Sequence, residues 1–368
     1  MMKTYDLNIE VITPIHIGDA QGRLSPLEFF QDQHAIYLVH EKTWAQKLAS
    51  IQGIDSFISY VESNERASLD GFLLELGPSK EKHMRQGTFL RRIPKGERFL
   101  IKNFQPFIFD RGILEPYIPG TSLKGAIRAS ILFHLSGNSS KFAEIKSLAL
   151  RKDRRASAKA DELLRARLET RGRWRVDPQT DWLRFLQVTD AYPLQTNSSE
   201  VRAVKIVSLN LERGYHFSAR DAQIFVETIK PGSKFSARVK LDQDGWQILK
   251  DYYGEKTPFI LEDWLELGSE KTKALSAEEK EFYQQADLSR LGEELEYCEK
   301  QGANLRLGWG SGLAGTSLVL RFSPHERQTL RQQYFQRRRH HQFPQSRKVV
   351  MDNNLPSHSL GWIRLSLS

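Results

Sequence analysis

Hydrophobic and polar side chains alternate near the start of the chain. Leu7, Ile9 and Val11 are apolar, and the residues between them are polar. A period of two is typical of a β-strand with one buried face, so residues 5–14 are predicted to form a strand that ends at Pro14. Strand-like patterns recur at 35–39, 98–109, 184–192 and 203–213, in a short segment after 317, and at 360–368.

Apolar residues recur every four positions later in the first half. These positions are Leu123, Ile127, Ile131 and Leu135. The spacing puts them on one face of a helix that is predicted to run from about Ser122 to Leu135, with Thr121 or Ser122 as its N-cap. Further helices are predicted at 41–51, in two short segments before Gly77, and between about 258 and 300.

Two strand patterns flank a short turn sequence in the second half. QIFVETI (223–229) and KFSARVKL (234–241) lie on either side of KPGS (230–233). Because Pro and Gly are typical of hairpin turns, these two strands are predicted to be antiparallel neighbours.

The order of these elements indicates the fold class. Strands with intervening helices occur in each half, which predicts an α+β protein whose antiparallel sheets carry helices on one face. The length of 368 residues exceeds the usual size of one hydrophobic core. The predicted organisation is an N-terminal domain at 1–138, a basic helical insertion or connection at 139–180, and a C-terminal domain at 181–368.

Positive charge is concentrated in two stretches. Residues 151–175 hold ten Lys or Arg against four Asp or Glu, and residues 325–350 hold seven against one. A polyanion-binding surface requires such clustering. Aromatic residues within or beside both stretches offer stacking faces for bases. They are Trp174, Trp182, Tyr334, Phe335 and Phe343. Nucleic acid is therefore the predicted partner, with an acidic protein as the alternative.

Composition narrows the class of protein further. Hydrophobic residues make up 39% of the chain and charged residues 27%, as in soluble globular proteins. The sequence contains no run of about 18 apolar residues and no signal-peptide core, so a cytoplasmic protein is expected. The single cysteine, Cys298, is expected to pack in the core, and neither a cofactor nor a metal site is predicted.

The first candidate binding motif is YIPGTSLKGAIRASI (117–131). Lys124 and Arg128 are four residues apart, so they share a helix face near the helix N-terminus, where backbone N–H groups favour phosphate. Lys124 precedes Gly125, whereas a nucleotide-hydrolysing P-loop has Lys after its second Gly. Two interpretations remain: a phosphate-binding helix start, or a capped helix with two solvated cations.

The second candidate is the glycine-rich segment LGWGSGLAGTS (307–317). Gly308, Gly310 and Gly312 surround Trp309, and Arg306 precedes them. Glycines leave backbone N–H groups uncovered, which suits binding of phosphates or of an extended strand. Although the spacing also fits a dinucleotide fingerprint, the segment follows a helical pattern rather than a strand. The alternative is an exposed linker.

These motifs, in their order, resemble the RAMP superfamily of CRISPR-associated RNA-binding proteins. The resemblance lies in VITPIHIGDAQGRLSPLEFF (11–30), in YIPGTSLKGAIRASIL (117–132) and in RLGWGSGLAGTSLVL (306–320). The ending, FPQSRKVVMDNNLPSHSLGWIRLSLS (343–368), is most similar to the fifth subunit of type III-A (Csm) effector complexes.

The resemblance implies a fold, a function and partners. It implies two ferredoxin-like, RRM-type domains in a non-catalytic subunit that caps a ribonucleoprotein, binds the 3′ part of the CRISPR RNA and supports its 3′-end maturation in antiviral defence. The implied partners are the CRISPR RNA, the terminal backbone RAMP subunit, the small helical subunit, and host or accessory nucleases. The implied RNA-facing residues are His16, Gly18, Lys124, Gly125, Arg128, Arg306, Gly308, Trp309, Gly310 and Gly312.

Two catalytic alternatives remain open. In the first, His16 serves a metal-independent, CRISPR RNA-processing endoribonuclease as general base. In the second, the chain is a repeating backbone subunit that cleaves target RNA through a loop aspartate, Asp19 or Asp32.

Overall fold

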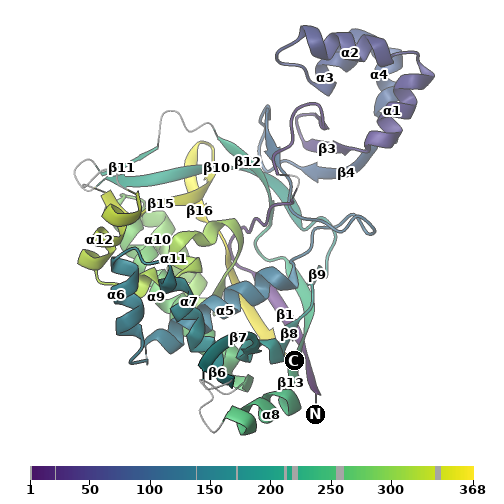
Figure 1. Cartoon of the computed structure of the whole chain (residues 1–368). Helices are drawn as coiled ribbons and strands as arrows, with labels where there is room; N and C mark the ends of the chain where they lie inside the picture. Colours follow the sequence, from purple (N-terminus) through teal and green to yellow (C-terminus); the bar gives the residue numbers. More distant parts are fainter. Residues whose placement is uncertain are drawn as a thin grey trace.

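Two six-stranded sheets form the body of the protein (Figure 1). The computed structural model describes residues 2–20, 22–137, 139–170, 173–210, 214–217, 223–253, 261–335 and 341–368. The first sheet has the order β14 (Leu305–Arg306), β17 (Trp362–Leu367), β1 (Met2–Val11), β13 (Lys234–Asp242) and β8 (Leu186–Val188), with β9 (Tyr192–Pro193) beside β13. The second has the order β16 (Leu355–Ser359), β15 (His341–Asp352), β10 (Ser199–Asn210), β12 (Ile224–Ile229) and β5 (Phe104–Gln105), with β11 (Gly214–Phe217) beside β10.

The first sheet packs on the helix that carries the first motif. Strand β1 pairs antiparallel with both β13 and β17, and its alternating residues Leu7, Ile9 and Val11 are buried. Helix α5 (Gly120–Gly137) buries its predicted apolar stripe in the same core. The predicted strand and the predicted helix stripe are both confirmed.

The second sheet packs on two consecutive helices, α9 (Trp264–Gln285) and α10 (Ser289–Lys300). Cys298 of α10 is buried in this core, as expected, and burial raises the pKa of its thiol to about 12. Both sheets are antiparallel except where β5 pairs parallel with β12, and the helices packed on them confirm the α+β class.

Residues 29–94 contribute a separate lobe with its own small core (Figure 1). Its sheet consists of β2 (Phe29–Gln31), β3 (Ala35–Val39) and β4 (Phe89–Pro94). Its helices are α1 (Glu41–Ser50), α2 (Ile54–Ser63), α3 (Leu69–Leu76) and α4 (Pro78–Arg85). Trp44 and Phe72 are buried between sheet and helices.

The other elements connect or cover the sheets. The helices are α6 (Phe142–Leu150), α7 (Arg155–Asp161), α8 (Gln243–Tyr253), α11 (Gly312–Thr316) and α12 (Pro324–Phe335). The 3₁₀ turns are η1 (Glu162–Leu164), η2 (Trp182–Phe185), η3 (Leu261–Asp263), η4 (Gly308–Ser311) and η5 (Val319–Arg321), and β6 (Arg165–Thr170) pairs with β7 (Arg173–Asp181). No helix in the described ranges is long and apolar enough to cross a membrane.

The predicted hairpin around KPGS is wrong. Strand β12 pairs with β10 and β5 in the second sheet, whereas β13 pairs with β1, β8 and β9 in the first. The turn therefore passes the chain from one sheet to the other, and its Gly232 N–H donates to the carbonyl of Val11 in β1. Long-range pairing, which the local turn sequence does not encode, decides the partners.

Three further predictions of local structure need correction. Within 98–109 only β5 is a strand, although Phe104 and Phe107 are fully buried. The basic segment 139–180 holds the β6–β7 pair as well as helices, and the strand expected after 317 is the 3₁₀ turn η5.

Helix α5 also starts differently from the prediction. It begins at Gly120, and neither Thr121 nor Ser122 is its N-cap. The N–H of Gly120 donates instead to the carboxylate of Asp190, 2.7 Å away, and the N–H of Ser122 donates to the carbonyl of Pro119. A distant acidic side chain therefore takes the role expected of a local hydroxyl.

Each of the two large sheets draws strands from both sides of the predicted boundaries. Strand β1 lies between β13 and β17, and β5 pairs with β12. The boundaries predicted at 138 and 180 therefore do not separate the two sheets, because the N-terminal strand is central to a sheet built mainly from the C-terminal half.

Candidate nucleic-acid interface

The first basic stretch begins beside the second, although the two are far apart in sequence. Helix α6, which leads into the first stretch, packs on α12 (Figure 1), and Lys146 and Glu326 form an ion pair of 3.0 Å between them. The Tyr334 hydroxyl donates to the carbonyl of Ala149 over 3.4 Å, and the Lys152 ammonium lies 5.7 Å from the centre of the Tyr334 ring. Basic residues that are far apart in the sequence are therefore close together in the folded protein.

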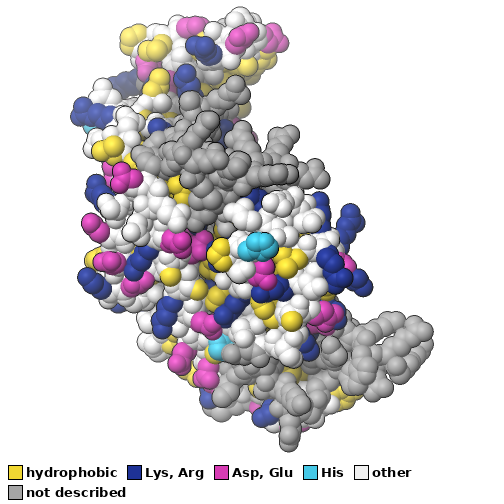
Figure 2. All heavy atoms as spheres, turned by 90° about the vertical axis from the view of Figure 1, so that its left-hand side faces the viewer, with side chains coloured by type: hydrophobic (Ala, Val, Ile, Leu, Met, Phe, Trp, Pro, Cys, Tyr) yellow, Lys and Arg dark blue, Asp and Glu magenta, His cyan; other side chains and the backbone are white. Residues whose placement is uncertain are grey.

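Many of the described cations in these stretches are already paired. Arg155 binds Asp153, Lys159 binds Glu162, and Arg327 binds Glu278. Figure 2 shows side chains of both signs interspersed over the face on which α6 and α12 lie. The arginines at 337–339 and 171 lie outside the described residues. Positive charge that is available to a ligand is therefore found at particular sites, not along whole helices.

Two adjoining cavities lie between these elements. The polar cavity, about 600 Å³, is lined by Arg306, by 310–314 and by 343–348. The apolar cavity, about 550 Å³, is lined by Gly125 and Arg128 of α5 and by residues of α6, α7, α11 and α12. Leu313 and Phe343 line both cavities. The structure thus brings the two candidate motifs to one region of the molecule.

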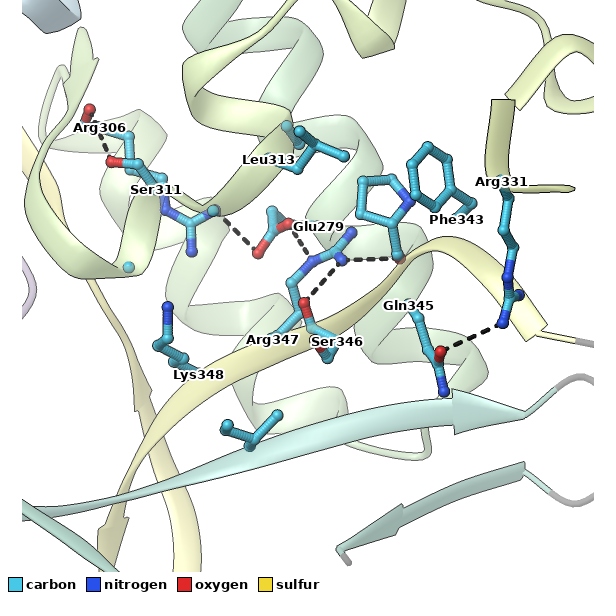
Figure 3. A pocket seen from close by; sticks show the side chains of 15 residues that line it. Glu279, Arg306, Ser311, Leu313, Arg331, Phe343, Gln345, Ser346, Arg347 and Lys348 are labelled. Atoms are coloured by element: carbon cyan, nitrogen blue, oxygen red, sulfur yellow. Dashed lines mark hydrogen bonds and ion pairs between the residues drawn. The ribbon is translucent and has the colours of Figure 1, made fainter. Parts of the chain in front are cut away.

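A buried ionic cluster forms one wall of the polar cavity (Figure 3). The Glu279 carboxylate is 1% exposed and accepts from Arg306 Nη1 at 3.0 Å and from Arg347 Nε. Burial alone would raise the pKa of this carboxyl, but the two arginines outweigh that effect and lower it. Arg306 also donates to the carbonyl of Leu360 at 2.9 Å and stacks over Trp362. Arg306 therefore holds β14 against neighbouring elements.

His16 is a structural residue in this fold. Its side chain is 3% exposed, and Nδ1 donates to the carbonyl of Glu227, 2.7 Å away. The carbonyl of His16 in turn accepts from the N–H of Trp309 at 2.8 Å, and the two rings meet edge-on at 5.7 Å. Burial is the main cause that lowers the pKa of His16, so the imidazole is neutral. Gly18, two residues on, is exposed and pairs through its backbone with Phe107.

The second glycine segment is folded rather than open. It forms η4 and α11, and Lys348 Nζ donates to the carbonyl of Trp309 at 3.0 Å while lying 4.4 Å from the centre of its ring. A side chain at Gly308 would overlap the His16 carbonyl, and one at Gly310 would overlap Leu360. The expected uncovered backbone cradle is therefore not found at these two glycines, whereas Gly312 has free space around it.

The two cations of the first motif differ in their surroundings. Arg128 Nη1 lies 2.6 Å from Asp181 and Nη2 lies 3.1 Å from Asp161, so the guanidinium connects α5 to α7 and to the end of β7. Lys124 is half-buried, and burial lowers its pKa, with Asp181 opposing that change and Arg128 adding to it. Gly125 is exposed and opens on the apolar cavity. Lys124 is thus the better candidate for a phosphate contact.

Replacing Arg128 by Met is expected to destabilise the protein by about 1–2 kcal/mol, because Asp161 and Asp181 lose the closer of the two cations that they share. The other cation, Arg165, stays 3.7 and 3.9 Å from the two carboxylates. Replacing Lys124 by Met is the matched control, with an expected change within about 0.5 kcal/mol. The measurement is urea unfolding of both variants. Equal losses of stability would contradict the assigned roles.

Four charged residues of the polar cavity are not among the site residues predicted from sequence. They are Glu279, Arg331, Arg347 and Lys348. The 277–299 segment has the composition of a solvated helix, yet Glu278 and Glu279 are buried against arginines from distant elements. The available signal was the Arg-Lys pair in the C-terminal motif. Among described side chains, no three of His, Cys, Asp or Glu are grouped to hold a metal ion.

Comparisons with known proteins agree with this architecture. The model of the RAMP superfamily matches residues 8–313. A chain in the cryo-EM structure of a Csm–crRNA–target RNA ternary complex of a type III-A CRISPR-Cas system aligns with a TM-score of 0.79 and 20% identity, over 98% of this chain and 100% of that one. The crystal structure of T. onnurineus Csm5 aligns with a TM-score of 0.69 and 19% identity, over 97% and 99%.

No curated protein sequence matches the chain. At about one-fifth identity, the structural likenesses show the fold, which confirms the predicted α+β, ferredoxin-like architecture. The superfamily match spans most of the chain, and it includes the first candidate motif and the glycine segment as far as residue 313. On this evidence the protein belongs to the RAMP superfamily.

Proposed function

We propose that this protein is a CRISPR RNA-binding end-cap subunit of a type III-A (Csm) effector complex, which holds the 3′ part of the CRISPR RNA and supports maturation of its 3′ end. The observation that carries the proposal is the alignment with a chain of a Csm–crRNA–target RNA complex over practically the full length of both chains. The likeness to Csm5 over a similar extent supports it.

The candidate residues fall into two groups according to whether they are accessible at the surface. Gly18, Lys124, Gly125, Trp309 and Gly312 are at least partly accessible, so they are proposed to face RNA. The other five support that surface: His16, Arg128, Arg306, Gly308 and Gly310. The side chains of His16, Arg128 and Arg306 form hydrogen bonds or ion pairs within the protein, and Gly308 and Gly310 pack closely against other residues.

The proposed partners follow from the same comparison. They are the CRISPR RNA, the terminal backbone RAMP subunit and the small helical subunit of the complex, together with host or accessory nucleases that trim the RNA. The proposed location is the cytoplasm, where such a complex meets its RNA.

The direct test is to purify the effector complex from cells with and without this protein and to sequence the ends of the bound RNA. Longer or heterogeneous 3′ ends in its absence, with unchanged 5′ ends, are expected. Identical 3′ ends in the two preparations would contradict the proposal.

We infer that the subunit acts without catalysing RNA cleavage itself, because the buried His16 imidazole has no access to a substrate hydroxyl. Asp32 is also occupied, since it accepts from His34 N, Ala35 N and the Tyr37 hydroxyl. Purified protein is expected to bind labelled RNA and leave it intact, with either EDTA or Mg²⁺ present. Cleavage that is lost on His16→Ala or Asp19→Ala would overturn this inference.

A further inference from the structure

The polar cavity gathers more positive than negative charge on its walls (Figure 3). Four cations line it: Arg306, Arg331, Arg347 and Lys348. Glu279 is the one carboxylate among its described lining residues. The nearby Glu278 is bound to Arg327 over 2.7 Å, and its second oxygen, which has no hydrogen-bond partner among the described residues, lies 3.9 Å from Arg347 Nη2.

Two guanidinium nitrogens in this wall lack hydrogen-bond acceptors. Arg306 Nη2 and Arg347 Nη2 are buried, and no acceptor among the described residues reaches either of them. The side chains are only 2% and 5% exposed, and both arginines belong to the lining of the polar cavity. A carboxylate oxygen of Glu278 lies 3.9 Å from Arg347 Nη2, which is beyond hydrogen-bond distance. A buried donor without a hydrogen-bond acceptor destabilises the folded protein, so a ligand that supplies an acceptor would be bound favourably.

Lys348 adds a third cation to the same wall. Burial lowers the pKa of its ammonium, and the charge of Arg306 lowers it further, which places the two cations near each other. Lys348 donates to the Trp309 carbonyl, and its ammonium is left with further protons to donate. Arg331, which donates to Gln345, lies apart from this group (Figure 3), so Arg306, Arg347 and Lys348 against Glu279 give 3 − 1 = +2 in the wall. An anion with about two negative charges would neutralise this net positive charge.

We propose that the polar cavity binds the terminal phosphate of a nucleotide, with Arg306 Nη2, Arg347 Nη2 and Lys348 Nζ as its ligands. A phosphate monoester carries about −1.5 to −2 at neutral pH, whereas an internal phosphodiester carries only about −1. Phe343 and Leu313 supply an apolar wall for the sugar and base, and about 600 Å³ is room for one nucleotide. The terminal phosphate of an RNA end and that of a free mononucleotide share this chemistry.

The proposal rests on the proposed function only where the phosphate belongs to RNA. The test therefore uses four probes with the full-length protein: one single-stranded RNA with a 3′-phosphate, the same RNA with a 5′-phosphate, the same RNA with hydroxyls at both ends, and adenosine monophosphate. Affinities are measured by fluorescence anisotropy and calorimetry.

The wild-type protein is expected to bind at least one end-phosphorylated RNA about tenfold more tightly than the hydroxyl-ended RNA. Lys348→Met removes a cation without leaving a carboxylate unpaired, and Arg347→Lys keeps a charge beside Glu279 while removing Nη2. Both variants are expected to lose this preference. Lys273→Met, at an exposed position of α9, is the control and should retain it.

The possible results test the phosphate-binding cavity and the proposed RNA binding independently of each other. Equal affinity for all three RNAs would overturn the phosphate pocket and leave RNA binding standing. Binding of adenosine monophosphate that is lost in both cavity variants, with no RNA binding, would support the pocket and overturn the proposed function. A phosphate preference that persists in both correctly folded variants would place the phosphate elsewhere and overturn the proposal.

Discussion

Replacing Glu279 by Gln is expected to lower the free energy of unfolding by about 3–5 kcal/mol, the largest loss that we predict for a single substitution in this protein. The Glu279 side chain is 1% exposed and pairs with both Arg306 and Arg347, whose side chains are almost equally buried. Its removal leaves two guanidinium groups in the interior without their shared carboxylate. Those charges cannot be neutralised, because arginine keeps its proton at any physiological pH.

The measurement is equilibrium unfolding in guanidinium chloride, which gives the midpoint and the slope. Glu281→Gln is the matched control, because Glu281 is two residues on in α9, is exposed, and accepts a hydrogen bond from Gln285 over 3.0 Å. Its effect should stay within about 0.5 kcal/mol. Similar small effects for both variants would show that the cluster does not hold the β14, α9 and β15 elements together.

The ionic cluster around Glu279 could not be predicted from the sequence, in contrast to the local elements. The α5 stripe and the β1 alternation were predictable, because each is a local pattern whose period matches one element. The burial of Glu279, by contrast, depends on residues that are distant in the sequence. Its partners Arg306 and Arg347 lie 27 and 68 residues later, and nothing in the helix itself distinguishes a buried carboxylate from a solvated one.

The pairing of strands was beyond local patterns for the same reason. The KPGS turn was identified correctly as a turn, but β13 is paired with β1, more than 220 residues away, over nine register positions. Such long pairing outweighs the local hairpin, because it buries Leu7 and Ile9 against Phe235 and Val239. Gly125, Arg128 and the glycine segment were identified as candidates from sequence, whereas their convergence around Leu313 and Phe343 needed the fold.

Replacing Gly308 by Ala is expected to destabilise the protein by about 2–4 kcal/mol. Gly308 has φ = 77°, which costs an alanine about 1–2 kcal/mol. An added Cβ would also overlap the carbonyl oxygen of His16, a backbone atom that cannot move aside without shifting the loop after β1, which adds about 1–2 kcal/mol. The same carbonyl accepts the Trp309 N–H, so this hydrogen bond is expected to break.

Gly312→Ala is the control that separates these two causes. Gly312 also has a positive φ, 56°, with a ψ of −167°, but no atom lies within 4 Å of the position its Cβ would take, so only the backbone cost of about 1–3 kcal/mol applies. Thermal unfolding of both variants measures the difference, and equal losses would show that contact with His16 is unimportant. A larger loss at Gly308 means that the glycines at 308 and 310 serve close packing. Phosphate recognition would then depend on the side chains of Arg347 and Lys348 and not on an exposed glycine backbone.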